Sequence, residues 1–205
     1  AGAPKVPSSF AASRPASWSL NADGTPVLQG HVGPVCSLFD PAVTEYFEAE
    51  VERWARAYPV AGFLWDELKP VDFLDYHPLA VRAGGGAPSQ AAQLEAAVRF
   101  LTRIGAAARR GRSGVRRGLF LYAHCPDPVI DRLAACEELD DFGCDGRPWR
   151  RDDPVEDPQH ASEKVLLGTG ERFLDAARRH GKRSLFLAEN HNIRTADGNR
   201  WLDKR

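Results

Sequence analysis

The chain of 205 residues is 43% hydrophobic, which is enough apolar material for one sizeable core. Its 27 Lys and Arg residues nearly balance its 28 Asp and Glu residues, and the formal net charge is −1. This balance argues against nucleic acid as a partner, because nucleic-acid-binding proteins usually carry a clear basic excess. No apolar run approaches the ~20 residues of a membrane-spanning helix, so we expect no membrane partner either.

Residues 1–39 are predicted to form an irregular N-terminal segment, because proline interrupts them repeatedly. Ala1–Ala16 has no continuous apolar stretch and is therefore not an intact signal peptide. Within the segment, Asn21–Gly24 has the composition of a turn between two short β-like runs, Ser17–Leu20 and Pro26–Gln29. The chain has no methionine, even at position 1, so we expect it to be part of a longer protein.

From residue 40 to residue 205 the pattern changes to regular α/β structure, which we take as the catalytic domain. A helix is predicted to start with Asp40 as its N-cap and Pro41 at its first position, and to end at Pro59. The next stretch, Val60–Trp65, is short and apolar, which is typical of a strand buried on both faces.

The same alternation of helix and strand is repeated three more times. Helices are predicted at Ser89–Arg109, Pro126–Cys136 and Ser162–His180, and strands at Gly118–Ala123, Leu139–Cys144 and Ser184–Ala188. Apolar strands that alternate with helices predict a parallel sheet with right-handed crossovers. The arginine cluster between the second helix and its strand (Arg109, Arg110, Arg112, Arg116, Arg117) is interpreted as a solvated helix end.

Polar side chains follow each of the four predicted strands. Asp66 and Glu67 follow the first, His124 the second, Asp145 the third and Glu189 the fourth. The carboxyl ends of parallel strands meet at one edge, so these groups are predicted to share a site there. No glycine-rich phosphate turn follows any strand, which disfavours a dinucleotide-binding sheet. The fold predicted is therefore a (β/α)8 TIM barrel, of which this chain supplies about four βα units.

Paired carboxylates on a barrel rim suit hydrolysis of a glycosidic bond, since one protonates the leaving oxygen and the other attacks or activates water. We therefore predict a glycosidase with a carbohydrate substrate and with no cofactor or metal. The catalytic candidates are Asp66, Glu189, Asp145 and Glu67, with Asp66 first because it directly ends an apolar strand. The substrate-binding candidates are Trp65, His124, Tyr76, Arg147, Trp149, Asn190 and His191.

The stretch Gly62-Phe63-Leu64-Trp65-Asp66-Glu67, with the helix before it, resembles a segment of bacterial glycoside-hydrolase-like TIM barrels. In the retaining α-galactosidase and α-glucosidase group, an aspartate ends the corresponding strand, commonly the fourth, and is the nucleophile. An aspartate about two strands later is the acid/base. The resemblance covers residues 35–70 and implies that Asp66 is the nucleophile and Asp145 the acid/base, although Ala61 replaces the usual aspartate before the glycine.

The resemblance has two further implications. If the first strand is the fourth of the barrel, the chain supplies strands four to seven. In retaining β-glycosidases the acid/base ends the fourth strand and a nucleophilic glutamate ends the seventh, which implies these roles for Glu67 and Glu189.

Three other interpretations stay open. A metal-dependent hydrolase would use Asp66, His124, Glu189 and His191 as ligands, although no HxH or HExxH spacing is present. A barrel that binds carbohydrate or a partner without catalysis is the second, and an open doubly wound sheet is the third.

The four cysteines form no CxxC pair, which argues against a zinc knuckle.

Overall fold

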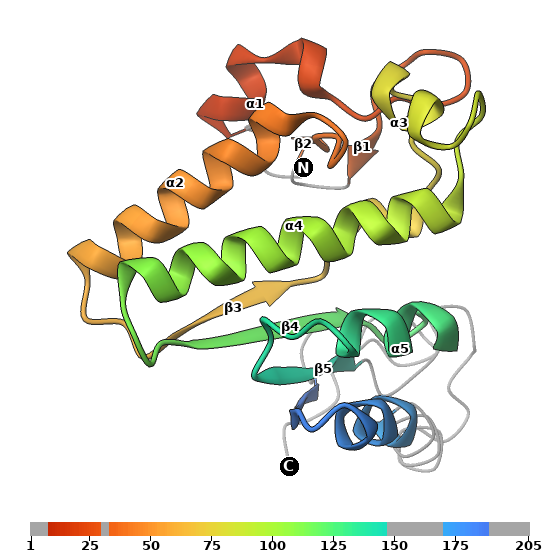
Figure 1. Cartoon of the computed structure of the whole chain (residues 1–205). Helices are drawn as coiled ribbons and strands as arrows, with labels where there is room; N and C mark the ends of the chain where they lie inside the picture. The colour runs from red at the N-terminus through yellow and green to blue at the C-terminus, as the bar shows by residue number, and fades with distance from the viewer. Residues whose placement is uncertain (1–7, 30–32, 147–169, 189–205) are drawn as a thin grey trace, which may run out of the picture. The chain divides into compact units, whose positions relative to one another are not determined.

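The structure is a computed structural model that describes residues 8–29, 33–146 and 170–188 (Figure 1). The chain divides into two compact units. The first contains Ala1–Phe63, Leu68–Arg117 and Ala135–Glu138, and the second contains Leu64–Glu67, Gly118–Ala134 and Leu139–Arg205. None of the described helices is both long and apolar enough to cross a membrane.

The first unit is built on two long helices, α2 (Pro41–Ala57) and α4 (Gln90–Gly111), which lie side by side (Figure 1). The predicted N-cap of α2 is confirmed, because the Asp40 carboxylate accepts a hydrogen bond from the Ala42 N–H at 3.0 Å. Ser89 caps α4 in the same way, at 3.4 Å from the Ala92 N–H. The helices approach closely at Gly111, where an added Cβ would lie 2.6 Å from the Cβ of Ala55.

The N-terminal segment consists of short elements, and a buried carboxylate from a later part of the chain binds it. The short elements are α1 (Ser9–Ser13), η1 (Pro15–Ser17), β1 (Leu28–Gln29) and β2 (Gly33–Pro34). Two further short helices, η2 (Lys69–Asp72) and α3 (Pro78–Ala83), lie between β3 and α4 in the sequence. The predicted turn is confirmed by the antiparallel bridge between Leu20 and Pro26. Asp75, which is 0% exposed, accepts hydrogen bonds from the Ser19 hydroxyl and the backbone N–H groups of Leu20 and His77.

The second unit contains most of a four-stranded parallel sheet. Its strands are β3 (Gly62–Asp66), β4 (Arg116–Tyr122), β5 (Asp141–Gly146) and β6 (Arg183–Ala188), in the order β3-β4-β5-β6. One row of the register joins Phe120, Gly143 and Leu185, and the row two residues later joins Tyr122, Asp145 and Leu187. The predicted mixed α/β class with a parallel sheet is therefore confirmed.

Two helices of the second unit lie on the same face of this sheet. They are α5 (Asp127–Ala134) and the helix over residues 170–179. Arg172 and Arg179 of the latter bind Asp127 at 2.6 Å and Asp131 at 2.8 Å. Phe173 stacks on Phe142 of β5, with ring centroids 5.9 Å apart. Right-handed crossovers between adjacent strands in sequential order require this one-sided arrangement.

The prediction that all four strands are buried on both faces is wrong for β3 and β6. Exposed and half-buried residues alternate along β3, and Phe186 and Leu187 of β6 are 43% and 48% exposed. These are the two outer strands of the described sheet, so each has a neighbour on one side only. The third strand begins at Asp141 and not at Leu139 as predicted. Pairing with β4 starts at Asp141, whereas Leu139 is buried in the core before the strand begins.

The arginine cluster is only in part a solvated helix end. Arg109, Arg110 and Arg112 are exposed as predicted, but Arg117 is only 7% exposed. Arg117 belongs to β4, and its guanidinium binds Glu138 at 2.8 Å, while Arg109 binds the same carboxylate at 2.6 Å. Burial of Arg117 is tolerated because this charge is paired.

Candidate functional site

The carboxyl ends of the parallel strands lie at one edge of the sheet, and β3 brings Asp66 there as its last residue, with an exposed side chain. Glu67 follows with a φ of 42°, the single non-glycine residue with positive φ in the described part of the chain. Its N–H donates a hydrogen bond to the carbonyl oxygen of Phe120 in β4, at 3.0 Å. The chain therefore stays bonded to the sheet at the residue where its backbone direction changes.

The end of β4 contributes an aromatic pair. The ring of Tyr122, the last residue of the strand, stacks on that of His124, with centroids 5.0 Å apart and planes 22° apart. The His124 side chain is exposed, at the edge predicted for it. Tyr122 was not among the predicted site residues. The signal that could have found it is the alternation along β4, since Tyr122 lies on the same face as Gly118 and Phe120.

Asp145 belongs to β5, where its backbone pairs with Tyr122 on one side and Leu187 on the other. Asp66, the Tyr122–His124 pair and Asp145 therefore come from three adjacent strands, at the same edge of the sheet. Trp65 is half-buried within β3, and Tyr76 belongs to the first unit, where it is 36% exposed. The other predicted site residues lie outside the described residues; they are Arg147, Trp149, Glu189, Asn190 and His191.

The face of the sheet opposite α5 carries apolar side chains and glycines. A Cβ added to Gly118 would lie 2.9 Å from the Leu64 side chain, 3.3 Å from the Cβ of Asp141 and 3.6 Å from Leu185. Leu64 is 52% exposed on this face. At Gly143 an added Cβ would overlap the carbonyl oxygen of Leu185, so only glycine fits this position.

An ion pair joins β5 and β6 at the opposite edge from the candidate site. The Arg183 guanidinium donates two hydrogen bonds to Asp141, at 2.7 and 3.2 Å. The Asp141 side chain is 6% exposed. Both residues stand at the first position of their strands, so this pair holds the register at the amino-terminal edge.

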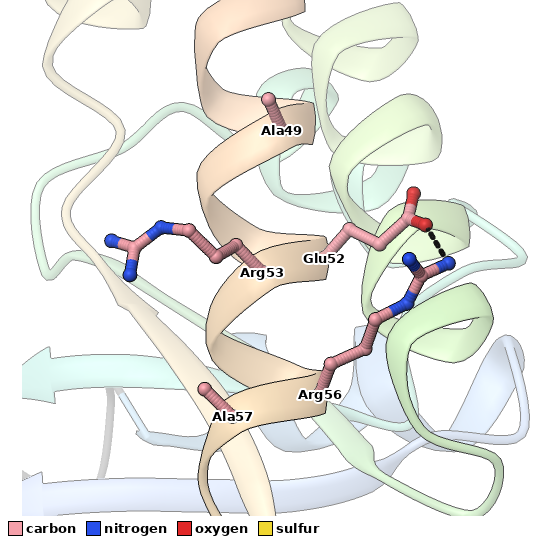
Figure 2. A pocket seen from close by; sticks show the side chains of 5 residues that line it. All are labelled: Ala49, Glu52, Arg53, Arg56 and Ala57. Carbon is pink, nitrogen blue, oxygen red and sulfur yellow. Dashed lines mark hydrogen bonds and ion pairs between the residues drawn. The ribbon is translucent and has the colours of Figure 1, made fainter.

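A hollow of about 530 Å³ lies on α2 in the first unit. It is lined by five residues of this one helix, none of them a predicted site residue. Figure 2 shows Glu52 and Arg56 reaching toward each other, while Arg53 points to another side of the helix. The short side chains of Ala49 and Ala57 leave the space between these long ones open. The hollow is a gap between side chains and has no arrangement of catalytic groups.

In the described part of the chain, no three side chains of His, Cys, Asp or Glu gather in a way that could hold a metal ion. The candidate site is thus the Asp66 carboxylate and the Tyr122 and His124 rings at the carboxyl edge of a parallel sheet, where the backbone of Asp145 also lies. No protein-family model matches the sequence, and a search of curated proteins finds no match.

Proposed function

We propose that this chain is part of a glycoside hydrolase that cleaves its substrate at the carboxyl edge of the sheet, with Asp66 as the principal catalytic carboxylate. The observation that carries the proposal is the sequential parallel order of the strands. Because β3, β4 and β5 are neighbours, the strand ends that carry Asp66, Tyr122 and Asp145 lie together. Two carboxylates at such an edge, beside aromatic rings, suit the cleavage of a glycosidic bond.

We further propose that the four strands are part of a (β/α) barrel. Three features support this fold: the described strands follow one another without a reversal, the two helices described in the second unit share one face, and the other face carries Leu64, Leu185 and Leu187. In a barrel that apolar face would turn inward, and further strands would cover it. An open doubly wound sheet would require helices on both faces and a reversal of strand order.

The proposed mechanism uses Asp66 with a second carboxylate from a later strand. Strands β3 and β5 are separated by two spacings of about 4.8 Å, so their backbones lie roughly 10 Å apart in a flat sheet. Closure into a barrel turns inward-facing side chains toward one another, which reduces the distance between the carboxyl groups. A separation of about 5–5.5 Å suits a retaining mechanism and about 6.5–9.5 Å an inverting one.

In the retaining version, an Asp66 oxygen attacks the anomeric carbon while the bond to the leaving oxygen breaks. Asp145 gives its proton to that oxygen and then takes one from the water that hydrolyses the glycosyl–enzyme ester. Tyr122 and His124 offer a flat aromatic surface at the same edge, on which a sugar ring can stack. Glu189, the residue that follows β6 in the sequence, is the alternative partner.

The test is a panel of 4-nitrophenyl α- and β-glycosides assayed with wild type, Asp66→Asn, Asp145→Asn and Glu189→Gln. Asp175→Asn is the matched control, because Asp175 is an exposed carboxylate on the helix over residues 170–179. We expect Asp66→Asn to lower kcat at least about 10³-fold and the control to leave it unchanged. Sodium azide should restore turnover to a nucleophile variant by forming a glycosyl azide. Activity that survives Asp66→Asn would overturn the assignment, and binding of a sugar without turnover would identify a non-catalytic barrel.

A further inference from the structure

A second hollow in the first unit, of about 370 Å³, differs from the one on α2 because it combines arginines with an apolar floor. Three helical regions line it: the start of α2, α3 and the middle of α4. Its volume is at the lower end of the range of small-molecule sites. No acidic residue is among those that line it.

Three arginines lie at this hollow. Arg82 comes from α3, and Arg99 and Arg103 come from one face of α4, a turn apart. Arg103 binds Glu48 of α2. Arg82 and Arg99 are exposed, and neither has an ion-pair or hydrogen-bond partner within the residues that the structure describes. Among the acids that adjoin lining residues in the sequence, Asp40 has its carboxylate oxygens engaged by the Ala42 N–H and the Ser17 hydroxyl, and Glu95 also has an interaction of its own.

The floor of the hollow is apolar and partly aromatic. Phe100 of α4, which is 6% exposed, lies between Arg99 and Arg103 in sequence, and Phe39 and Leu79 also line the hollow. An apolar floor lowers the local dielectric constant, so an ion held against it interacts with a guanidinium more strongly than in water. Uncompensated positive charges on such a floor repel each other, and an anion would remove this repulsion.

We infer that this hollow is a binding site for a small phosphate monoester with an apolar or aromatic body. A phosphate monoester carries −1.5 to −2 charges near pH 7 and three strong acceptor oxygens. It therefore matches two unpaired guanidinium groups on different helices, whereas one arginine is enough for a carboxylate. The apolar body lies against Phe39, Leu79 and Phe100. This inference is independent of the proposed hydrolase site.

The test is isothermal titration of the full chain with 1-naphthyl phosphate, with three related probes as comparison arms. We expect saturable binding at one site, weaker binding of 1-naphthoate and of inorganic phosphate, and no measurable binding of 1-naphthalenemethanol. A naphthoate affinity equal to that of the phosphate would overturn the choice of a phosphate head group. Equal affinity of the alcohol would show that the hollow is merely apolar, and no binding of naphthyl phosphate at millimolar concentration would overturn the site.

Two variants and a control locate the site on the protein. Arg82→Gln and Arg99→Gln each remove one unpaired charge and should weaken 1-naphthyl phosphate binding about 10- to 100-fold. Arg53→Gln removes an exposed arginine that does not line this hollow and should leave the affinity within about twofold. Circular dichroism checks that the variants are folded. An equal loss in all three variants would show that net charge alone attracts the probe, and the site would be rejected.

Discussion

The backbone N–H of Glu67 donates a hydrogen bond to the carbonyl oxygen of Phe120 while Glu67 itself adopts a left-handed conformation, with φ 42°. For a residue with a side chain this conformation costs about 1–2 kcal/mol. The cost falls on the residue directly after Asp66, at the edge where we propose catalysis. Strained backbone is often found at functional sites, where the surrounding structure holds it.

Replacement of Glu67 by glycine is therefore expected to raise the free energy of unfolding by up to about 1 kcal/mol. Glycine adopts positive φ without strain, although its larger loss of chain entropy offsets part of the gain. Glu67→Val is the opposing variant, because a β-branched side chain fits this backbone poorly. Urea denaturation measures the free energy of unfolding of both variants. If valine is tolerated as well as glycine, the conformation of residue 67 does not strain the fold.

Gly143 should tolerate no side chain at all. A Cβ at this position would overlap the carbonyl oxygen of Leu185, which is a backbone atom of the neighbouring strand and cannot rotate away. We expect Gly143→Ala to lower the free energy of unfolding by at least about 3 kcal/mol, the upper end for overpacking. Gly170→Ala is the control, since its Cβ would meet Phe186 at an ordinary 3.5 Å. Thermal unfolding that ranks the two variants equally would contradict this geometry.

The pair Asp141–Arg183 should contribute to stability and not to catalysis. The Asp141 carboxylate is 6% exposed, so Asp141→Asn removes the charge that compensates Arg183 and weakens two hydrogen bonds. The expected loss is about 1–3 kcal/mol in the free energy of unfolding. The exposed Asp175→Asn should change it by less than about 0.5 kcal/mol. A turnover defect in folded Asp141→Asn protein would contradict the separation of the two edges.

The carboxylate of Asp131 should give the second unit a pH-dependent contribution to stability. Hydrogen bonds from the Arg179 guanidinium and then from the His180 ring lower the pKa of Asp131 from its ordinary 3.8. Because the folded-state pKa is depressed, this stabilisation is present above the unfolded-state pKa and is lost as the pH falls through the folded-state value.

Asp131 is 48% exposed, so solvent screens the pair and the contribution at neutral pH should be below about 1 kcal/mol. The measurement compares wild type with Asp131→Asn by urea denaturation at pH 7 and at pH 3. The difference in the free energy of unfolding should shrink at the lower pH. A difference that is the same at both pH values would show that the charge of Asp131 contributes nothing.

Much of the fold could be predicted from the sequence because local signals were strong. Asp40-Pro41 and Ser89 start their helices as predicted, and the alternation of helices with apolar strands predicted the parallel sheet. The exposure of β3 and β6 could not be predicted, because it depends on which strands are outermost and not on their composition. Arg117 was misassigned for a similar reason. Its partner Glu138 is 21 residues away, and no local pattern links them.

Part of the candidate site could be predicted from the periodicity of the strands. This periodicity assigned Asp66, His124 and Asp145 to strand ends, and these residues do lie at the carboxyl edge of the sheet. The same pattern does not single out Tyr122, because this residue ends a strand whose other residues are mostly apolar. The unusual φ of Glu67 has no signal in residue type, since glutamate is not a residue that favours positive φ.

The Asp141–Arg183 pair has a consequence for how such a sheet can change over generations. Asp141 and Asp145 are four residues apart on one strand, which separates them by roughly 13 Å. Substitutions that far apart usually have independent effects. A lineage can therefore exchange residues at the carboxyl edge to acquire a new substrate while the bonds at the amino-terminal edge keep the strands aligned. The same separation is useful in laboratory selection. Substitutions that stabilise the amino-terminal edge allow destabilising substitutions at the carboxyl edge to be tolerated.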